Sequence, residues 1–312
     1  MVYLINPSTE PAFNLALEEY LLKEKKDEYL MLWRDRPAVI CGRNQNIFEE
    51  TDICLAERHG VAVLKRFTGG GAVYHDTGCI NYTLIIDDPS GTATYEKLTR
   101  PIIDALRAMG IAAYPGASGA INVNGKKVSG GAEARHRDRV LHHGTLLYST
   151  DLDALEQYAG RKTGLNTRSG VIESRSVKSS VAGVVNLSEL LPTISADKFM
   201  VSLEHFLNPL IAEKRELTDE ERRYADALAI NKYSTWEWNL GTSPRFNFCG
   251  VYRGEEIAYS AYHGIIDKTS PSLSMLVGCR LERKSLETAL KNRSDAAVLS
   301  EFIVSGREPQ IP

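Results

Sequence analysis

Apolar positions recur along this chain with a helical period in some segments and an alternating or continuous pattern in others. Phe13, Leu17 and Leu21 fall on one helical face and predict an amphipathic helix over residues 12–26 with its acidic side chains outward. Short apolar runs at 30–33 and 38–41 are typical of strands, and the Arg-Asp-Arg-Pro between them predicts a hairpin.

The same patterns, bounded by glycines and capping residues, predict the remaining elements. Thr218 with Glu221 forms a capping box, and Asp151 and Ser195 are good helix N-caps. The helices are expected over 51–59, 95–109, 152–158, 196–207, 219–230 and 285–292, and the strands over 61–67, 79–86 and 139–148.

Asn124-Gly125 lies between two strand-like runs and predicts a two-residue hairpin turn. Side chains alternate between the two faces of a strand, so Lys127 is expected to project from the side opposite the valines. The predicted register pairs Val123 with Lys126, Asn122 with Lys127 and Ile121 with Val128.

Breaks in the pattern after residue 238 predict a domain boundary. Gly241, Pro244 and Gly250 interrupt the apolar runs, and shorter strands follow. A chain of 312 residues suits one large domain with a smaller companion. We therefore expect a larger domain over 1–240 and a small C-terminal domain over 241–312.

Composition narrows the class of protein. A hydrophobic content of 43%, 25% charged residues and a net charge of −3 are typical of a globular protein and favour neither a nucleic acid nor a membrane as partner. Five scattered cysteines without a CxxC pair favour neither disulfides nor zinc, which indicates a reducing cytoplasm. No apolar run approaches the ~20 residues of a membrane span.

The run Lys65-Arg66-Phe67-Thr68-Gly69-Gly70-Gly71 predicts a loop that contacts a phosphate. Glycines let the backbone approach a ligand closely, so that successive N–H groups converge on an anion. The planar guanidinium of Arg66 adds two donors that match two phosphate oxygens. The alternative is a three-glycine turn without a ligand.

Three segments of this chain, at 69–78, 125–130 and 142–147, resemble the lipoate–protein ligase A family in order and spacing. Further similar segments lie at 14–19, 42–46, 186–192 and 236–238. The resemblance implies an α+β fold: a mixed sheet with flanking helices, as in biotin ligases and class II aminoacyl-tRNA synthetases, and a small C-terminal α/β domain.

The resemblance also implies a two-step reaction. Lipoate and ATP, with Mg²⁺, give lipoyl-AMP and pyrophosphate, and the lipoyl group then passes to a lysine of a carrier domain. The carrier is a dehydrogenase E2 subunit or the glycine cleavage H protein, and the enzyme is expected to be a monomer.

The family's functional residues map onto matching positions of this chain. Lys127 corresponds to the lysine that contacts both the lipoate carboxylate and the α-phosphate, although alone it reads as a solvated hairpin lysine. Arg66 corresponds to a nucleotide-contacting arginine. The adenylate-binding loop comprises Gly69, Gly70, Gly71, Ala72, Val73 and Tyr74, with the Tyr74 ring expected on the base or the acyl chain.

The lipoate pocket is expected to include His75, Asn81, Ser129, His143 and Gly144. His75 is expected to orient the loop rather than to transfer a proton. Neighbouring strand residues face opposite sides, so His142 and His143 do not predict a zinc site.

Two departures from the family pattern bear on the reaction. Ala117–Ala120 replaces Gly-Arg-Asn-Asp, whose aspartate is associated with Mg²⁺, so the metal site is left unassigned. Cys79 replaces a family asparagine, and a thiol there raises an acyl-thioester mechanism, although a packed side chain is the simpler interpretation.

Three functions remain open from the sequence. The first is ATP-dependent lipoate ligation. The second is lipoyl or octanoyl transfer from a preformed activated donor, which the missing aspartate permits. The third is a catalytically silent protein that binds lipoyl carriers.

Overall fold

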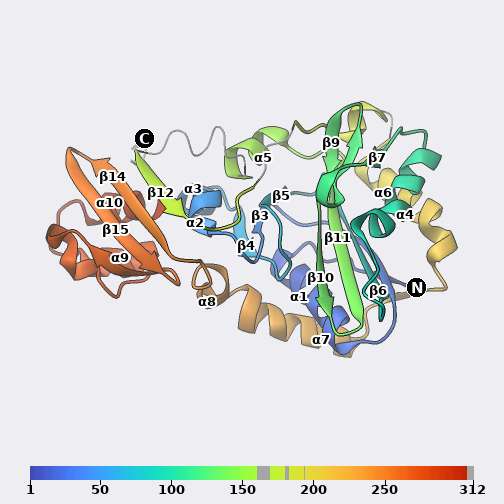
Figure 1. Cartoon of the computed structure of the whole chain (residues 1–312), viewed down its shortest axis with the longest axis horizontal. Helices are drawn as coiled ribbons and strands as arrows, with labels where there is room; N and C mark the ends of the chain where they lie inside the picture. The colour runs from blue at the N-terminus through green and yellow to red at the C-terminus, as the bar shows by residue number, and fades with distance from the viewer. Residues whose placement is uncertain (160–168, 180–182, 193, 308–312) are drawn as a thin grey trace.

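A six-stranded mixed sheet lies in the larger part of the molecule, at the right of Figure 1. The structure is a computed structural model that describes residues 1–159, 169–179, 183–192 and 194–307. The strand order is β10-β11-β6-β2-β1-β13, and the strands are β10 (Gly131–His136), β11 (Arg139–Leu147), β6 (Cys79–Asp87), β2 (Tyr29–Trp33), β1 (Val2–Ile5) and β13 (Glu213–Glu216). The mixed sheet of the predicted α+β fold is therefore present.

Helices cover both faces of this sheet. The helices α4 (Tyr95–Ala108) and α6 (Ala196–Leu207) pack on one face, and α1 (Pro11–Glu24) and α7 (Asp219–Leu228) pack on the other. Alternate strand residues enter the two cores: Leu32 faces α4 and α6, whereas Met31 faces α1.

Helix α1 forms where predicted, but the expected orientation of its acidic side chains is wrong. Glu18 and Glu19 are buried, whereas Glu24 is exposed. The helix lies between the sheet and α7, so almost its whole circumference is covered. Both carboxylates are instead hydrogen-bonded inside the protein.

The predicted hairpin between residues 30 and 41 is wrong. Strand β2 pairs with β1 and β6, whereas β3 (Ala38–Cys41) belongs to a separate sheet with β4 (Ala62–Lys65) and β5 (Val73–His75). The connecting Asp35 is fully buried and accepts a hydrogen bond from Asn14 at 2.7 Å, so the chain crosses between sheets instead of turning back.

The Asn124-Gly125 turn forms as predicted and closes β8 (Ile121–Val123) and β9 (Lys126–Ser129), which pair beside β7 (Tyr114–Pro115). Asn124 and Gly125 have φ values of 49° and 78°, a left-handed pair that suits this turn. The predicted pairs Val123 with Lys126 and Asn122 with Lys127 are confirmed. The third is wrong: the register shifts between Ile121 and Asn122, so Ile121 pairs with Ser129 instead of Val128.

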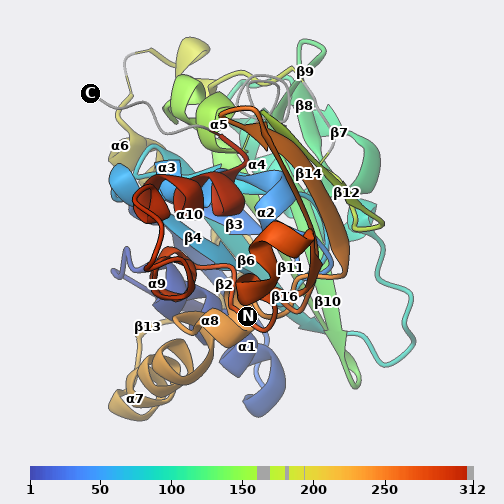
Figure 2. The ribbon, with the colours of Figure 1, turned by 90° about the vertical axis from the view of Figure 1, so that its left-hand side faces the viewer.

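Residues 246–307 build most of a second region, at the left of Figure 1. Its four-stranded sheet has the order β12-β14-β15-β16, with β12 (Gly170–Ser174), β14 (Phe246–Tyr252), β15 (Glu255–Tyr262) and β16 (Ile265–Thr269). Figure 2 shows α9 (Arg283–Ala289) and α10 (Ala296–Ser305) beside this sheet. Strand β12 comes from before residue 240, so the sheet joins both sides of the predicted boundary.

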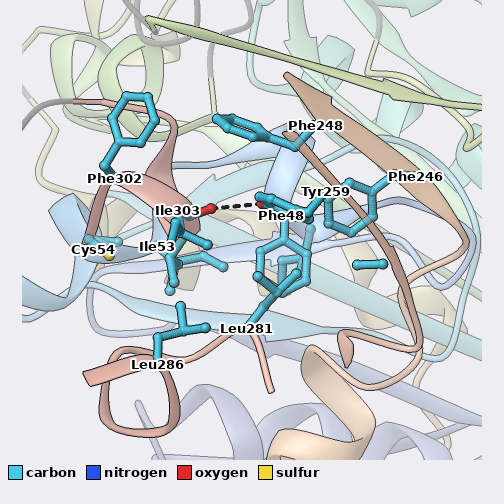
Figure 3. Close-up of a cluster of buried hydrophobic side chains, with 14 of the residues drawn as sticks. Phe48, Ile53, Cys54, Phe246, Phe248, Tyr259, Leu281, Leu286, Phe302 and Ile303 are labelled. Carbon is cyan, nitrogen blue, oxygen red and sulfur yellow. Dashed lines mark hydrogen bonds between the residues drawn. The ribbon is translucent and has the colours of Figure 1, made fainter. Parts of the chain in front are cut away.

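One hydrophobic core links this region to the rest of the chain. Phe48 of α2 (Ile47–Glu50) and Ile53 of α3 (Ile53–Arg58) are buried in the same cluster as Phe246, Phe248 and Phe302 (Figure 3). The hydroxyl of Tyr259 donates to the carbonyl of Ile303 at 2.7 Å. The boundary near residue 240 stays a prediction.

The remaining elements are short or follow the predicted caps. Asp151 accepts from the Ala154 N–H at 2.9 Å, and the capping box of α7 is present. Within the described residues, no helix is long and apolar enough to cross a membrane. The other helices are α5 (Leu152–Ala159), the π-turn Ala229–Tyr233 and α8 (Trp236–Asn239), and short 3₁₀ turns lie at Ala117–Gly119, Leu187–Glu189, Asn208–Leu210 and Pro271–Leu276.

Candidate active site

A pocket opens between the main sheet, the glycine loop and the β8–β9 hairpin. It brings together three segments that are far apart in the sequence and that the family resemblance selects. The predicted residues on its wall are Arg66, Gly71, Ala72, Val73, His75, Asn81, Lys127, His143 and Gly144, and they are joined by Leu15, Trp33, Ile40, Gly130, Gly131, Ala132, Thr145 and Ser179.

Lys127 brings a positive charge to this pocket. Within the described residues, no carboxylate lies within ion-pairing distance of its ammonium group. Burial lowers the pKa of Lys127, because desolvation disfavours the charged form. Gly130 leaves space for the ammonium: a Cβ there would lie 3.1 Å from Nζ. Such a cation is ready to bind an anion that enters the pocket.

Arg66 is buried and holds the glycine loop from the inside. Its Nη2 donates to the carbonyls of Gly69 at 2.6 Å and Gly71 at 2.8 Å. Its Nη1 donates to the carbonyl of Ile40, and its Nε donates to the hydroxyl of Thr68, each at 2.9 Å. The fork predicted to face phosphate oxygens is therefore turned toward the protein's own carbonyls, and burial lowers the pKa of Arg66 to about 10.

This clamp sets the direction of the loop N–H groups. In a trans peptide the N–H points opposite to the preceding carbonyl. Because Arg66 holds the Gly69 and Gly71 carbonyls, the N–H groups of Gly70 and Ala72 point away from the guanidinium. The Ala72 N–H donates to the hydroxyl of Ser179 at 2.8 Å. Ala72 lines the pocket, so its N–H could bind an incoming phosphate oxygen once that oxygen displaces the Ser179 hydroxyl.

Ser179 belongs to a segment, residues 174–179, that crosses the rim of the pocket. Its hydroxyl accepts from Gln45 Nε2 at 3.1 Å as well as from Ala72, and donates to the carboxylate of Glu50. Ser174 and Lys178 bind Glu49. No sequence motif predicted this contact with the glycine loop.

The structure places some predicted residues away from the pocket. The Tyr74 ring is buried on the opposite side of β5, where it stacks on Tyr158 at 6.0 Å between centroids. Only its backbone is left to line a ligand site. Gly69 and Gly70 are not among the described residues that line the pocket, and Ser129 is fully buried beside Tyr82.

The two neighbouring histidines face opposite sides of β11, as predicted. His143 lines the pocket, and its Nε2 lies 2.9 Å from the Thr68 hydroxyl. His142 packs against Tyr82 and Tyr95 on the other face, and burial lowers its pKa to about 3. His142 is therefore a neutral core residue.

His75 and Asn81 add polar groups to the pocket wall. His75 Nδ1 binds the buried carboxylate of Asp35 at 2.7 Å, and burial raises the pKa of Asp35. Asn81 Oδ1 accepts a weak hydrogen bond from the Cys79 thiol, whereas Asn81 Nδ2 has no partner among the described residues. This amide is a donor for a ligand.

The donor set of the pocket does not fit a protein-bound Mg²⁺ ion. Magnesium usually takes one or two carboxylates besides phosphate oxygens and water. Within the described part of the chain, no aspartate or glutamate lines the pocket, and no cluster of three potential metal ligands occurs. Ala120 supplies no side-chain oxygen where the family has its aspartate.

Cys79 is a packed side chain and not a nucleophile. Its thiol is fully buried, and desolvation raises its pKa well above the ordinary value. The thiol therefore stays protonated, which argues against the acyl-thioester mechanism.

Comparison with known proteins decides the family. The profile described as "Lipoyl protein ligase A/B catalytic domain" matches residues 10–207. The chain belongs to this family. Lipoate–protein ligase 1 of Staphylococcus aureus (strain Mu50) is 35% identical over 307 residues, which cover 91% of this chain and 92% of that protein. The membership predicted from the sequence is confirmed.

Solved structures agree with this assignment. A lipoate–protein ligase A bound with ATP is 25% identical, with a TM-score of 0.65 over 77% of this chain and 98% of that one. A bipartite lipoate–protein ligase from Thermoplasma acidophilum, studied together with its E2 lipoyl domain, is 26% identical, with a TM-score of 0.64 over 77% and 96%. The predicted α+β ligase fold is confirmed.

Proposed function

We propose that this protein is an ATP-dependent lipoate–protein ligase whose pocket holds lipoyl-AMP between Lys127 and the glycine loop. The observation that carries the proposal is the Lys127 ammonium, which is partly desolvated and has no carboxylate partner within the described residues. It shares the pocket wall with Gly71, Ala72 and Val73 of the loop. The similarity to lipoate–protein ligases supports lipoate and ATP as substrates.

The first step joins lipoate to the nucleotide. A carboxylate oxygen of lipoate attacks the α-phosphorus of ATP, and the bond to the pyrophosphate oxygen breaks. Negative charge grows around the α-phosphate, where Lys127 and the loop donors stabilise it. A compact ammonium with rotatable donors suits two anions that change geometry during the step.

The second step needs no nucleophile from the enzyme. The amine of the carrier lysine attacks the acyl carbon of lipoyl-AMP, an amide forms, and AMP leaves as the amine loses its proton. Because the anhydride is already activated, the protonated Cys79 has no role in it. Lys127 again stabilises the departing phosphate.

The Thermoplasma relative, studied with its E2 lipoyl domain, supports an E2 lipoyl domain as carrier, with a glycine cleavage H protein as the alternative. We place the protein in a reducing cytoplasm because all five cysteines are unpaired thiols. We further propose that it acts as a monomer and that residues 241–312 are an accessory part of the catalytic region.

The test is lipoate-dependent exchange of labelled pyrophosphate into ATP, followed by lipoylation of a purified E2 domain or H protein. Exchange that needs lipoate and falls in Lys127→Ala is expected. Wild-type protein that exchanges no pyrophosphate at any lipoate concentration would reject the proposal.

One observation favours a second function, transfer from preformed lipoyl-AMP or another activated donor. Among the described residues, the pocket has no carboxylate to place a metal beside the phosphates, which weakens adenylation more than transfer. Synthetic lipoyl-AMP separates the two functions. A transferase modifies the carrier only when the adenylate is supplied, whereas a ligase also modifies it from free lipoate and ATP.

A further inference from the structure

A continuous chain of hydrogen bonds runs from the core of the main sheet to the glycine loop. It starts on β2, passes through β6 and α1, and reaches the loop by way of β11. The links are Trp33 Nε1 to Thr83 Oγ1 at 2.8 Å, Thr83 Oγ1 to Glu18 Oε1 at 2.6 Å, Glu18 to His143 Nδ1 at 2.9 Å, His143 Nε2 to Thr68 Oγ1 at 2.9 Å, and Thr68 Oγ1 to Arg66 Nε at 2.9 Å.

The carboxylate of Glu18 fixes the direction of the links, because an ionised carboxylate can only accept. The Thr83 hydroxyl and Nδ1 of His143 therefore both donate to Glu18. In the neutral imidazole of His143 the proton then sits on Nδ1, and the unprotonated Nε2 accepts from the Thr68 hydroxyl. Thr68 in turn accepts from Arg66 Nε, as Thr83 accepts from Trp33 Nε1.

This hydrogen-bond chain is buried, and packing alone does not explain a glutamate at position 18. Glu18 and Thr83 are fully buried, and Thr68 is 1% exposed. Within the described residues, the only basic group at the Glu18 carboxylate is the imidazole of His143. Burying a carboxylate costs free energy that an apolar side chain avoids.

We infer that Glu18 is a positioning residue of the ligase. Glu18 fixes the tautomer of His143, and His143 in that tautomer orients the Thr68 hydroxyl. The Thr68 hydroxyl in turn holds Arg66 on the carbonyls of Gly69 and Gly71. The N–H groups of Gly70 and Ala72 are thereby kept pointing away from the clamp. This role rests on the proposed function, because the clamp holds Gly71 and Ala72 on the pocket wall, where charge develops in the adenylation step.

The test compares Glu18→Leu with Glu18→Gln and with Glu19→Gln as the matched control. Glu19 is the next residue of α1 and is also buried, but its carboxylate binds Lys23, Lys232 and Tyr233 instead. Two quantities are measured: kcat and KM of lipoate-dependent pyrophosphate exchange, and the ¹⁵N spectrum of His143, assigned with a His143→Gln variant.

In the wild type we expect His143 to carry its proton on Nδ1. Glu18→Leu removes the acceptor, so the Nε2–H tautomer gains population and kcat falls by about 10- to 100-fold, with a smaller change in KM. Glu18→Gln keeps an acceptor oxygen and retains most of kcat and the Nδ1–H signal. Glu19→Gln changes neither readout.

A second pair of variants covers the case in which Glu18→Leu does not fold. Thr68→Val breaks the chain without altering the buried charge, and Thr68→Ser restores the hydroxyl. We expect kcat to fall in the first and to recover in the second. The same kcat in Thr68→Val as in Thr68→Ser would overturn the inference.

The spectra separate this inference from the proposed function. A wild-type His143 protonated on Nε2, or an unchanged tautomer and kcat in Glu18→Leu, contradicts the positioning role. Absence of exchange in the wild type rejects the proposed function and, with it, the role of Glu18 in adenylation, while the Nδ1–H signal still shows whether the hydrogen-bond chain exists.

Discussion

At the scale of single residues, a half-buried lysine and a fully buried lysine near the pocket have different roles. Lys127 keeps its ammonium on the pocket wall, where an anion compensates for the desolvation that lowers its pKa. The side chain of Lys65 is fully buried, and its Nζ donates to the carbonyl of Gln45 at 3.1 Å. Burial lowers the pKa of Lys65 to about 8, and no ligand relieves that cost.

Replacement of Lys65 by methionine is therefore expected to stabilise the fold at neutral pH. The pKa of Lys65 is lower in the folded than in the unfolded state, so the penalty is complete below about pH 8 and disappears as pH rises through the unfolded pKa of about 10.5. We expect Lys65→Met to raise the free energy of unfolding at pH 7 by about 3 kcal/mol or less.

Urea denaturation of both proteins at several pH values measures this difference. The gap between Lys65→Met and the wild type should narrow from pH 8 upward. A gap that stays constant, or a less stable variant at pH 7, would show that Lys65 does not carry a buried charge.

The residues of the site could be predicted from the sequence wherever a contiguous motif contains them. Lys127, the glycine loop and His143 all lie within such motifs, and all reach one pocket. Glu18 and Thr83 are 65 positions apart, and the role of each depends on a contact that no local pattern encodes. The orientation of Arg66 was missed for the same reason, because the guanidinium meets acceptors of its own loop.

At the scale of elements, the glycine loop lies directly against the end of β3. A Cβ at Gly42 would stand 2.1 Å from the carbonyl oxygen of Gly70. The neighbouring atom is backbone, so the loop itself must move to accept a side chain. The close contact between Gly42 and Gly70 therefore fixes the position of the glycine loop relative to the pocket.

We expect Gly42→Ala to weaken binding of a non-hydrolysable lipoyl-adenylate analogue by about tenfold or more, because a displacement of ~1 Å misaligns the donors. Titration calorimetry measures the affinity. Gly110→Ala is the control: Gly110 has a φ of 85° but no atom within 4 Å of an added Cβ, so this substitution brings backbone strain without a steric clash. Equal affinities for the two variants would contradict the proposed role of this approach.

Element prediction succeeded where a helical or alternating pattern was unambiguous. Helices α4, α6 and α7 and strands β6 and β11 lie close to their expected bounds. Helix α10 was missed because it is apolar over most of its surface, which hides the helical period. The wrong hairpin at 30–41 has another cause: strands adjacent in sequence joined different sheets, and only tertiary packing decides that.

At the scale of the whole molecule, the C-terminal region and the α2–α3 segment form one core. Figure 3 shows Phe302 and Leu286 of this region around Ile53 and Cys54. Arg58 forms an ion pair with Glu301, and Arg307 with Asp52. Large apolar interfaces of this kind oppose independent motion of the parts they join.

The shared core predicts that a mutation in α10 destabilises the main sheet as well. Phe302→Ala should lower the free energy of unfolding by about 3–5 kcal/mol. The midpoint of the unfolding transition reported by Trp33 fluorescence should fall as well. Trp33 is isolated as a fluorescent probe by replacing Trp236 and Trp238 with phenylalanine, and circular dichroism follows the whole chain. If the unfolding transition reported by Trp33 has the same midpoint in Phe302→Ala as in the wild type, while the C-terminal region unfolds in a separate transition, the two parts are independent domains.

The central claim is that one pocket holds lipoyl-AMP between Lys127 and the glycine loop, and calorimetry with a non-hydrolysable lipoyl-adenylate analogue tests it most directly. We predict tight one-site binding to the wild type, a loss of about 100-fold or more in Lys127→Met, and little change in Lys126→Met, whose exposed side chain is the neighbouring residue of the same hairpin. Equal binding by all three proteins would contradict the account.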